Sequence, residues 1–310
     1  MNSPTRSTQS KPPSEPNIAP KKADLPLEMQ RKVPDQLVMY SDRVTSTIRI
    51  LDGIAITTSG SGPPVVLLHA NGGDHHDFDA IVGDLGRHAT VHALDWPGHG
   101  TSDSVDDPSA CGFAELLPGV LERIGEGPFT LIGNSVGGFA ALRTAARRPD
   151  LVRALVLVNP GGFTPRWPTT FLACRLFGSE RVAPVAMRML PRLYLRRRTP
   201  AVNRIRAAAV ASSHEPDKVR TFARIWRSFI DPDHDARPDA QSVTSPTLVI
   251  WGTRDPVLPW WVDGQRARQL LDQAQVVTLP CGHQAFAELP ERFLAELGAF
   301  LGDSEGDRDA

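Results

Sequence analysis

The sequence predicts an α/β fold in which a doubly wound, mostly parallel sheet carries an inserted, all-helical segment. From about residue 45 onward, short apolar runs rich in β-branched residues alternate with longer helical patterns, as in a sheet whose strands are joined by helices. These runs are almost continuously apolar, which is typical of strands covered on both faces. Residues 160–246 break the rhythm, because they contain helical patterns and no strand signal.

The expected strands and helices follow in order along the chain. Residues 48–50 and 54–57 predict an opening hairpin around Asp52 and Gly53, since Asp-Gly is a strong turn signal. The later strands are expected at residues 65–69, 91–95, 129–133, 155–159, 247–251 and 276–279. The helices that lie between most of them are expected at residues 78–87, 114–124, 136–147, 262–272 and 290–301.

The chain divides into a core, an insertion and two tails. Residues 1–36 hold seven prolines and ten charged residues but few large apolar side chains, so we expect a disordered tail. The core is predicted to comprise residues 37–160 and 241–302, and residues 303–310 to form a flexible C-terminus. Residues 161–240 predict an all-helical cap over the core. Its helices are expected at residues 170–177, 185–195, 201–212 and 217–229.

Charge and cysteine content exclude several classes of protein. The net charge of −1 gives no reason to expect a nucleic-acid partner, although the predicted cap alone carries 15 Lys and Arg against seven acidic residues. Three widely spaced cysteines exclude a disulfide scaffold and fit a reducing compartment. No apolar run is long enough for a transmembrane segment, and the first ten residues lack the apolar middle of a signal peptide. We therefore expect a cytoplasmic protein.

A glycine-rich turn carries the strongest chemical signal. The stretch G-N-S-V-G at residues 133–137 follows an apolar strand and opens a helical pattern. A G-x-S-x-G in this setting predicts a nucleophile elbow, in which Ser135 occupies a strained turn at a helix N-terminus that favours developing negative charge. The alternative is a glycine-rich turn with an incidental serine, and the strand–turn–helix context disfavours it.

At these residues the chain resembles the α/β-hydrolase fold family, and the resemblance extends over about residues 45–302. The family orders its catalytic triad as nucleophile, acid and histidine. Asp255 follows one late predicted strand and His283 follows the next, so the resemblance implies that they are the acid and the base. Taken alone, Asp255 would be interpreted as a turn residue and His283 as a structural or surface histidine. In the triad, His283 removes the Ser135 proton while Asp255 fixes the imidazole tautomer.

The resemblance also implies an oxyanion hole made of two backbone N–H groups. One belongs to Val136, directly after the nucleophile. The second comes from the segment after the first parallel strand, where Asn71 matches the donor position and Ala70 replaces the family's usual glycine. His69 is interpreted as a structural hydrogen-bonding residue. The stretch D-W-P-G-H-G-T-S at residues 95–102 is similar to a structural turn of the family and supports the fold alone.

Other candidates concern the substrate pocket and metals. Ala70, Trp260 and Trp261 are expected to line the pocket, although simple core packing of the two tryptophans is a close alternative. The His and Asp residues at 74–77 suggest a metal site, but adjacent histidines in a polar loop seldom converge on one ion. We therefore expect no metal and no organic cofactor.

A serine nucleophile disfavours the family's dehalogenases and epoxide hydrolases, which use a carboxylate, and its dienelactone hydrolases, which use cysteine. Esterases or lipases, amidases, carbon–carbon bond hydrolases and cofactor-free haloperoxidase-like enzymes remain. Among them, the expected function is that of a carboxylesterase- or lipase-like serine hydrolase that cleaves an ester-type acyl substrate through an acyl-enzyme. A carbon–carbon bond hydrolase of meta-cleavage-product type is one alternative, because its elbow is similar to G-N-S-x-G-G. A ligand receptor that retains the triad is another.

The predicted cap leaves three options for the substrate. Its net charge of +8 could steer a small anionic acyl substrate, and its apolar positions could instead contact an uncharged acyl chain. Alternatively, the basic helices that end at Arg196, Arg197 and Arg198 could rest transiently on anionic lipid. A solvated arginine face on an ordinary cap is the plainest interpretation. The sequence does not indicate an oligomeric state.

Overall fold

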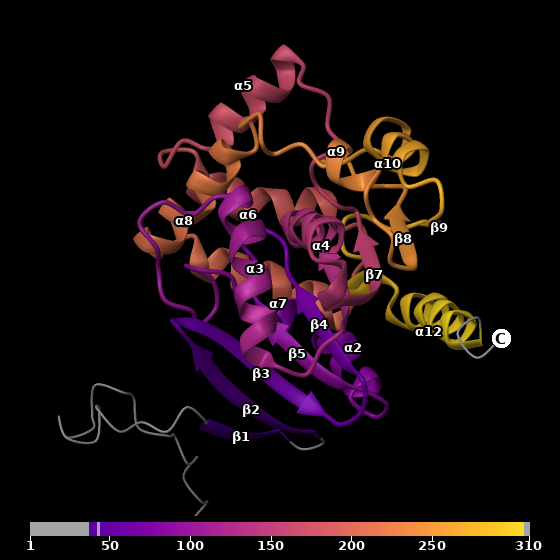
Figure 1. Cartoon of the computed structure of the whole chain (residues 1–310). Helices are drawn as coiled ribbons and strands as arrows, with labels where there is room; N and C mark the ends of the chain where they lie inside the picture. Colours follow the sequence, from indigo (N-terminus) through magenta and orange to yellow (C-terminus); the bar gives the residue numbers. More distant parts are fainter. Residues whose placement is uncertain (1–36, 42–43, 307–310) are drawn as a thin grey trace, which may run out of the picture. The chain divides into compact units, whose positions relative to one another are not determined.

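The computed structural model describes residues 37–41 and 44–306 (Figure 1). Nine strands form one sheet in the order β1-β2-β3-β5-β4-β6-β7-β8-β9. In this order, neighbouring strands are antiparallel from β1 to β5 and parallel from β5 to β9. The predicted fold class is thus confirmed. The strands are β1 (Leu37–Ser41), β2 (Val44–Leu51), β3 (Ile54–Gly60), β4 (Pro64–Leu68), β5 (Thr90–Leu94), β6 (Phe129–Asn134), β7 (Val152–Val158), β8 (Thr247–Gly252) and β9 (Gln275–Leu279).

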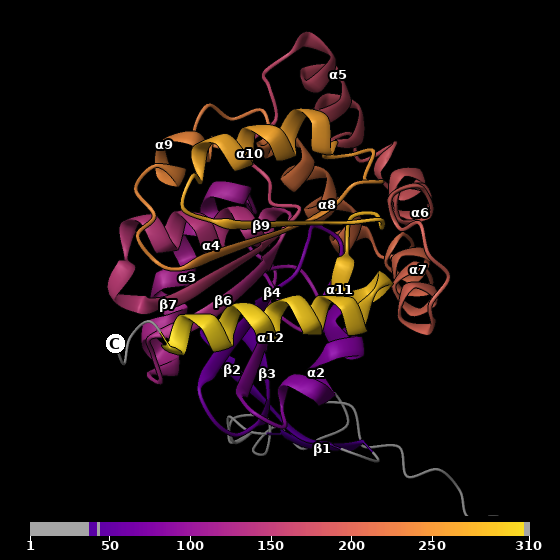
Figure 2. The same ribbon diagram turned by 90° about the vertical axis from the view of Figure 1, so that its right-hand side faces the viewer.

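Helices cover both faces of the sheet, as the apolar strands predict. Alternate residues of β4 belong to different cores: Val66 and Leu68 pack with α3 and α4, whereas Val65 and Leu67 pack with α2 and α12. Figure 2 shows α3 and α4 on one side of the strands and α12 on the other. These helices are α2 (Asp79–Leu85), α3 (Ala110–Ile124), α4 (Val136–Arg147) and α12 (Pro290–Gly306).

Between β7 and β8 the chain forms helices only, and we call this stretch, α5 to α9, the helical insertion. Each of its helices has a proline at its first or second position, where a missing N–H and a fixed φ favour helix initiation. The insertion has a small core of its own, in which Met187 and Leu190 of α6 pack with Phe222 of α8. Its helices are α5 (Pro168–Phe177), α6 (Ala183–Tyr194), α7 (Pro200–Ser212), α8 (Pro216–Ser228) and α9 (Arg237–Ala240).

Several short elements differ from the prediction. Strand β1, and the four-residue helices α9 and α11 (Ala285–Glu288), were not expected, because segments this short carry no readable period. The helix predicted at residues 262–272 is α10 (Gln265–Leu270), preceded by a π-helical turn, Trp260–Gly264. The tail predicted at residues 1–36 lies outside the described residues, and α12 continues to Gly306, beyond its predicted end. Among the described residues, no helix combines the length and apolar character needed to cross a bilayer.

Candidate active site

Ser135 lies at the sharp turn between β6 and α4, with φ 55° and ψ −117°. This backbone conformation is strained for a residue with a Cβ and requires surrounding support. The Ser135 amide donates to the Val158 carbonyl (3.2 Å), and the Ser135 carbonyl accepts from the amides of Phe139 (3.0 Å) and Gly161 (2.9 Å). Bonds from both neighbouring elements thus hold the serine in the geometry expected of a nucleophile elbow.

Asp255 and His283 meet beyond the ends of β8 and β9. The Nδ1 atom of His283 lies 2.6 Å from Oδ2 of Asp255, and both side chains are buried. The other carboxylate oxygen of Asp255 accepts from the amides of Val257 (2.8 Å) and Leu258 (3.3 Å). With Nδ1–H donating to the carboxylate, Nε2 of His283 is the nitrogen left to accept a proton.

A close approach of two loops makes this pairing possible. Gly252, the last residue of β8, packs so tightly against the loop before His283 that a Cβ there would overlap the Gly282 carbonyl oxygen. The side-chain amide of Asn134, next to Ser135, donates to the backbone carbonyls of Val158 (2.8 Å) and His283 (3.0 Å). The elbow and the histidine loop are therefore joined directly.

Asn159, which follows β7, holds the Asp255 carboxylate and was not predicted as a site residue. Its Nδ2 donates to Oδ2 of Asp255 at 2.9 Å, and its Oδ1 accepts from the Gly252 amide at 2.8 Å. Its φ of +40° is in the left-handed region, which asparagine tolerates better than most residues. The available signal was its position at the end of a predicted strand, the same signal that identified Asp255.

Replacing Asn159 with alanine is expected to lower kcat on an ester substrate about tenfold. The carboxylate of Asp255 would lose one of its buried donors and the Gly252 amide its acceptor, so the free energy of unfolding should also fall by about 1–3 kcal/mol. Urea unfolding and steady-state kinetics measure the two effects. Asn203→Ala, on α7 and away from the cavity, is the matched control. Unchanged kcat in Asn159→Ala would show that Asp255 is oriented without this amide.

Ser135 and His283 line one cavity of about 480 Å³, together with the predicted residues Ala70, Asn71 and Val136. Asp255 lies behind His283 and does not line it. Much of the wall comes from apolar side chains of the helical insertion. These include Phe171, Phe177, Met187, Leu190, Ile205, Phe222 and Trp226.

The two predicted oxyanion donors come from adjacent segments at this cavity. Val136 is the first residue of α4, where N–H groups have no partner within the helix. A Cβ at Gly137 would overlap the Leu68 carbonyl oxygen, so the first turn of α4 is packed against the end of β4, close to Asn71. The backbone N–H of Asn71 donates to no atom within the described residues, whereas its side-chain amide donates to the Phe222 carbonyl at 3.2 Å.

The loop that carries Asn71 is held by His69, as its structural interpretation predicts. Burial lowers the pKa of His69 to about 4, so its ring is neutral. Nδ1–H donates to the Ala70 carbonyl (2.7 Å), and Nε2 accepts from the Trp96 amide (3.1 Å). Ala70 is not among the described non-glycine residues with positive φ; Gly72, at φ +81°, adopts that conformation instead. Alanine therefore fits where the family usually has glycine.

Trp260 and Trp261 do not line the cavity, so the pocket prediction is wrong for both. Pro259 leads into a π-helical turn that directs Val262 and Asp263 to the cavity wall instead. The Trp260 ring packs near Trp251, with ring centres 6.0 Å apart, whereas Trp261 is 70% exposed.

The cavity also contains Tyr194 and Gln284, which sequence reasoning missed, and Asp77, which it considered only for a metal site. Tyr194 lies edge-to-face with the His283 ring, with centres 5.1 Å apart. Gln284 donates to the Asp77 carboxylate at 3.1 Å, and burial raises the pKa of Asp77 well above its usual value. No local pattern predicts the pairing of Asp77 with Gln284, because the two residues are far apart in the chain.

Asp263 is a second carboxyl group in the cavity wall. Thr164 donates to its Oδ1, whereas Oδ2 has no hydrogen-bond partner within the described residues. Burial raises the pKa of Asp263 from 3.8 to about 6. The native state therefore holds this proton more tightly than the unfolded chain does, and the stability contributed by Asp263 declines as the pH rises from about 4 to above 6.

Asp263→Asn is accordingly expected to raise the free energy of unfolding at pH 8 by about 1–3 kcal/mol, because the amide removes the buried charge but keeps an acceptor for Thr164. At pH 4, where Asp263 is largely protonated, the variant and the parent should be nearly equal. Urea unfolding at both pH values measures the difference. A difference that does not depend on pH would contradict the assignment of the buried charge to Asp263.

The fold and this arrangement define a hydrolase of the α/β class. The profile of the family described as the alpha/beta hydrolase fold matches residues 63–290, and the chain belongs to this family. The resemblance stated from the sequence is thereby confirmed.

Individual relatives include several kinds of hydrolase. The chain is 30% identical over 268 residues to the pimeloyl-[acyl-carrier protein] methyl ester esterase of Nitrosomonas europaea, covering 78% of this chain and 97% of the relative. It is 29% identical over 255 residues to the 2-hydroxymuconate semialdehyde hydrolase of Pseudomonas putida, covering 77% and 90%. Among solved structures, a bacterial membrane phospholipase A matches with a TM-score of 0.70 at 27% identity, covering 85% and 87%.

Proposed function

We propose that the protein is a serine hydrolase that cleaves carboxyl esters of uncharged, apolar acyl groups through an acyl-enzyme. One observation carries the proposal. Ser135, in its strained turn, lines the same cavity as His283, whose Nδ1 lies 2.6 Å from a buried Asp255 carboxylate. A nucleophile, a base and a group that orients the base are thus assembled around a space for substrate.

The reaction uses these groups in two half-reactions. Ser135 Oγ attacks the ester carbonyl carbon while His283 Nε2 takes the hydroxyl proton, and the amides of Val136 and Asn71 stabilise the oxyanion. Collapse of the intermediate breaks the bond to the alkoxy oxygen, which leaves as the alcohol after taking the proton from His283. Water then gives a proton to His283 and attacks the acyl-enzyme. His283 returns that proton to Ser135 Oγ as the bond to the acyl carbon breaks, and the carboxylic acid leaves.

The cavity wall favours an uncharged acyl group over an anionic one. Arg166 is the only arginine or lysine of the described chain that lines the cavity, and its guanidinium already donates to the carbonyls of Ile230 (2.9 Å) and Asp231 (3.0 Å). The carboxyl groups of Asp77 and Asp263 are in the wall and would repel an anion whenever they are ionised. The remaining basic residues of the cap are therefore proposed to act outside the cavity.

A p-nitrophenyl ester series of increasing acyl length tests the proposal, with Ser135→Ala as the blank. We expect serine-dependent turnover with an optimum at intermediate length, because the cavity is apolar and of limited volume. An anionic analogue, such as a monoester of a dicarboxylic acid, should react more slowly than the neutral ester of equal length. A folded protein that turns over none of these esters would contradict esterase activity.

Carbon–carbon bond hydrolysis is the second candidate. It is favoured by the similarity to the 2-hydroxymuconate semialdehyde hydrolase and by the G-N-S-x-G-G elbow. Turnover of that semialdehyde faster than any ester would select it. Slow, near-stoichiometric turnover of every compound, together with tight binding of one of them, would instead indicate a ligand receptor.

A further inference from the structure

Large apolar side chains are exposed on two helices of the insertion. Nine large hydrophobic side chains are exposed in the described part of the chain, and six of them belong to residues 167–193. Each of the six is 50–69% exposed. Such a concentration on one segment is unusual for a surface that faces only water. The six are Trp167, Leu172, Leu176, Val185, Met189 and Leu193.

The spacing of these residues places them on defined helix faces. Leu172 and Leu176 are four residues apart on α5, and Val185, Met189 and Leu193 are four apart on α6. Side chains at this spacing follow one side of a helix. Figure 2 shows α5 and α6 one after the other along the same border of the molecule. We call these six residues the apolar stripes of α5 and α6.

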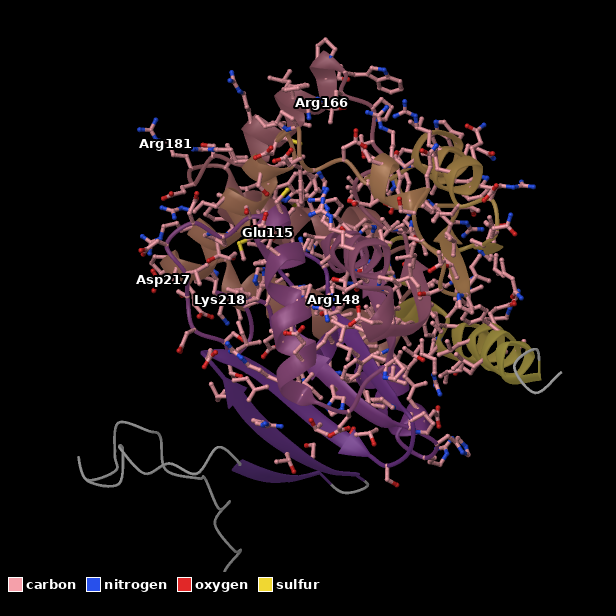
Figure 3. The ribbon with its side chains drawn as sticks, in the orientation of Figure 1. Glu115, Arg148, Arg166, Arg181, Asp217 and Lys218 are labelled. Carbon is pink, nitrogen blue, oxygen red and sulfur yellow. The ribbon has the colours of Figure 1, made fainter. Side chains whose placement is uncertain are left out.

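Arginines accompany the stripes and lack acidic partners. Between residues 167 and 198 there are seven arginines and one acidic residue, Glu180. Within the described residues, none of the seven forms an ion pair, whereas arginines elsewhere, such as Arg148, pair with two carboxylates. Figure 3 shows Arg181 directed away from the molecule. The seven are Arg175, Arg181, Arg188, Arg192, Arg196, Arg197 and Arg198.

The exposed stripes are continuous with the cavity wall. Trp167 and Leu193 are about half exposed and also line the cavity. The inner sides of the same two helices contribute Phe171 from α5 and Leu190 from α6 to the wall. An apolar surface therefore runs from the exterior of α5 and α6 to the space beside Ser135.

We propose that the apolar stripes and their arginines bind the surface of an anionic lipid bilayer. Apolar side chains that insert among acyl chains, flanked by arginines that contact anionic headgroups, are characteristic of helices that lie in the membrane interface. An acidic protein would neutralise the arginines but leave six protruding apolar side chains without an apolar environment. This part of the proposal rests on the proposed function: docking would place the cavity of an esterase next to the bilayer, where an apolar acyl substrate leaves the lipid.

Vesicle binding of the Ser135→Ala chain tests the proposal without turnover. We expect the chain to co-sediment with vesicles of equal parts phosphatidylglycerol and phosphatidylcholine at least tenfold more strongly than with phosphatidylcholine alone. The binding should weaken between about 0.1 M and about 1 M salt, because the arginine contribution is screened. Trp167, at the stripe, should shift its fluorescence to shorter wavelength on binding.

Two double variants separate the two parts of the surface. Leu172→Ser with Met189→Ser, and Arg175→Gln with Arg188→Gln, are each expected to weaken binding at least tenfold. The matched controls change exposed residues elsewhere: Ile50→Ser with Val105→Ser, and Arg254→Gln with Arg268→Gln. Neither control should alter vesicle binding. Equal losses in variants and controls would overturn the assignment to α5 and α6.

Other outcomes also decide the matter. Failure to bind anionic vesicles, or equal binding to both compositions, would overturn the proposal. Binding to an acidic protein in place of vesicles would assign the surface to a protein partner and overturn it equally. In the chain with Ser135 intact, the surface variants should hydrolyse a short soluble ester at the parent rate. If the chain binds anionic vesicles but hydrolyses no ester, the proposed function is contradicted, whereas the proposed membrane-binding role of the apolar stripes is supported.

Discussion

Replacing Ser135 with alanine is expected to lower kcat/KM on p-nitrophenyl esters by about 10⁴-fold or more, because Ser135 is the proposed nucleophile and alanine cannot form an acyl-enzyme. The fold should be unaffected, since alanine has the same Cβ at φ 55° and the backbone hydrogen bonds of residue 135 are retained. Steady-state kinetics and urea unfolding of the same preparation measure both. Ser212→Ala, on α7 and away from the cavity, should change neither quantity.

A Ser135→Ala chain that retained more than about a hundredth of the activity would show that Ser135 is not the nucleophile. Loss of stability with loss of activity would leave the role of the hydroxyl undecided by this variant alone. Ser135→Cys then distinguishes the two cases. It keeps a nucleophilic side chain of similar size, and it should be labelled by a thiol reagent if position 135 faces the cavity.

Glu288→Ala is expected to destabilise the native state strongly. The buried Glu288 carboxylate accepts from three backbone amides: Gly282 (2.9 Å), Arg196 (2.7 Å) and Arg197 (3.0 Å). Alanine would leave these donors without their acceptor and leave a void. We expect the free energy of unfolding to fall by about 3–5 kcal/mol. Gly282 directly precedes His283, so loss of its hydrogen bond should displace the His283 ring, and we expect kcat to fall by about 10–100-fold.

Glu288→Gln provides the matched comparison. The glutamine side chain has the size of glutamate and keeps one acceptor oxygen, but its NH₂ group faces a backbone N–H and cannot accept a hydrogen bond from it. Its losses should lie between those of the parent and of Glu288→Ala. Urea unfolding gives the stability, and the kinetics are measured at a temperature where all three chains are folded. Stability near the parent value in Glu288→Ala would mean that water can replace the carboxylate at these amides.

The sequence predicted the parts of the site that local order determines. Ser135 is recognisable because its strand, turn and helix are contiguous, and Asp255 and His283 because each directly follows an apolar strand. The carboxyl ends of parallel strands lie at the same edge of the sheet, so residues that directly follow the strands come together there, whatever the structure of the connecting segments. The sheet, its helices and the triad candidates could therefore be expected from the order of residues alone.

Contacts between distant segments could not be expected in this way. Glu288 meets Arg196 and Arg197 across about ninety residues of sequence, and no period or motif relates them. Trp260 was misplaced for another reason: the direction of its side chain depends on a π-helical turn, in which Gly264 makes room for the indole ring. Apolar composition indicates that a residue is buried, but the turn geometry decides which side of the loop it faces.

Hydrogen bonds join the end of α6 directly to the loop that carries His283. The His283 amide donates to the Tyr194 carbonyl at 3.0 Å, and Glu288 joins Gly282 to the two residues that follow Leu195. A displacement of this end of α6 would either carry His283, the proposed general base, away from Ser135 or break the hydrogen bonds that hold the His283 loop in place. We therefore expect any conformation in which α6 is displaced to be catalytically inactive until α6 returns to this position.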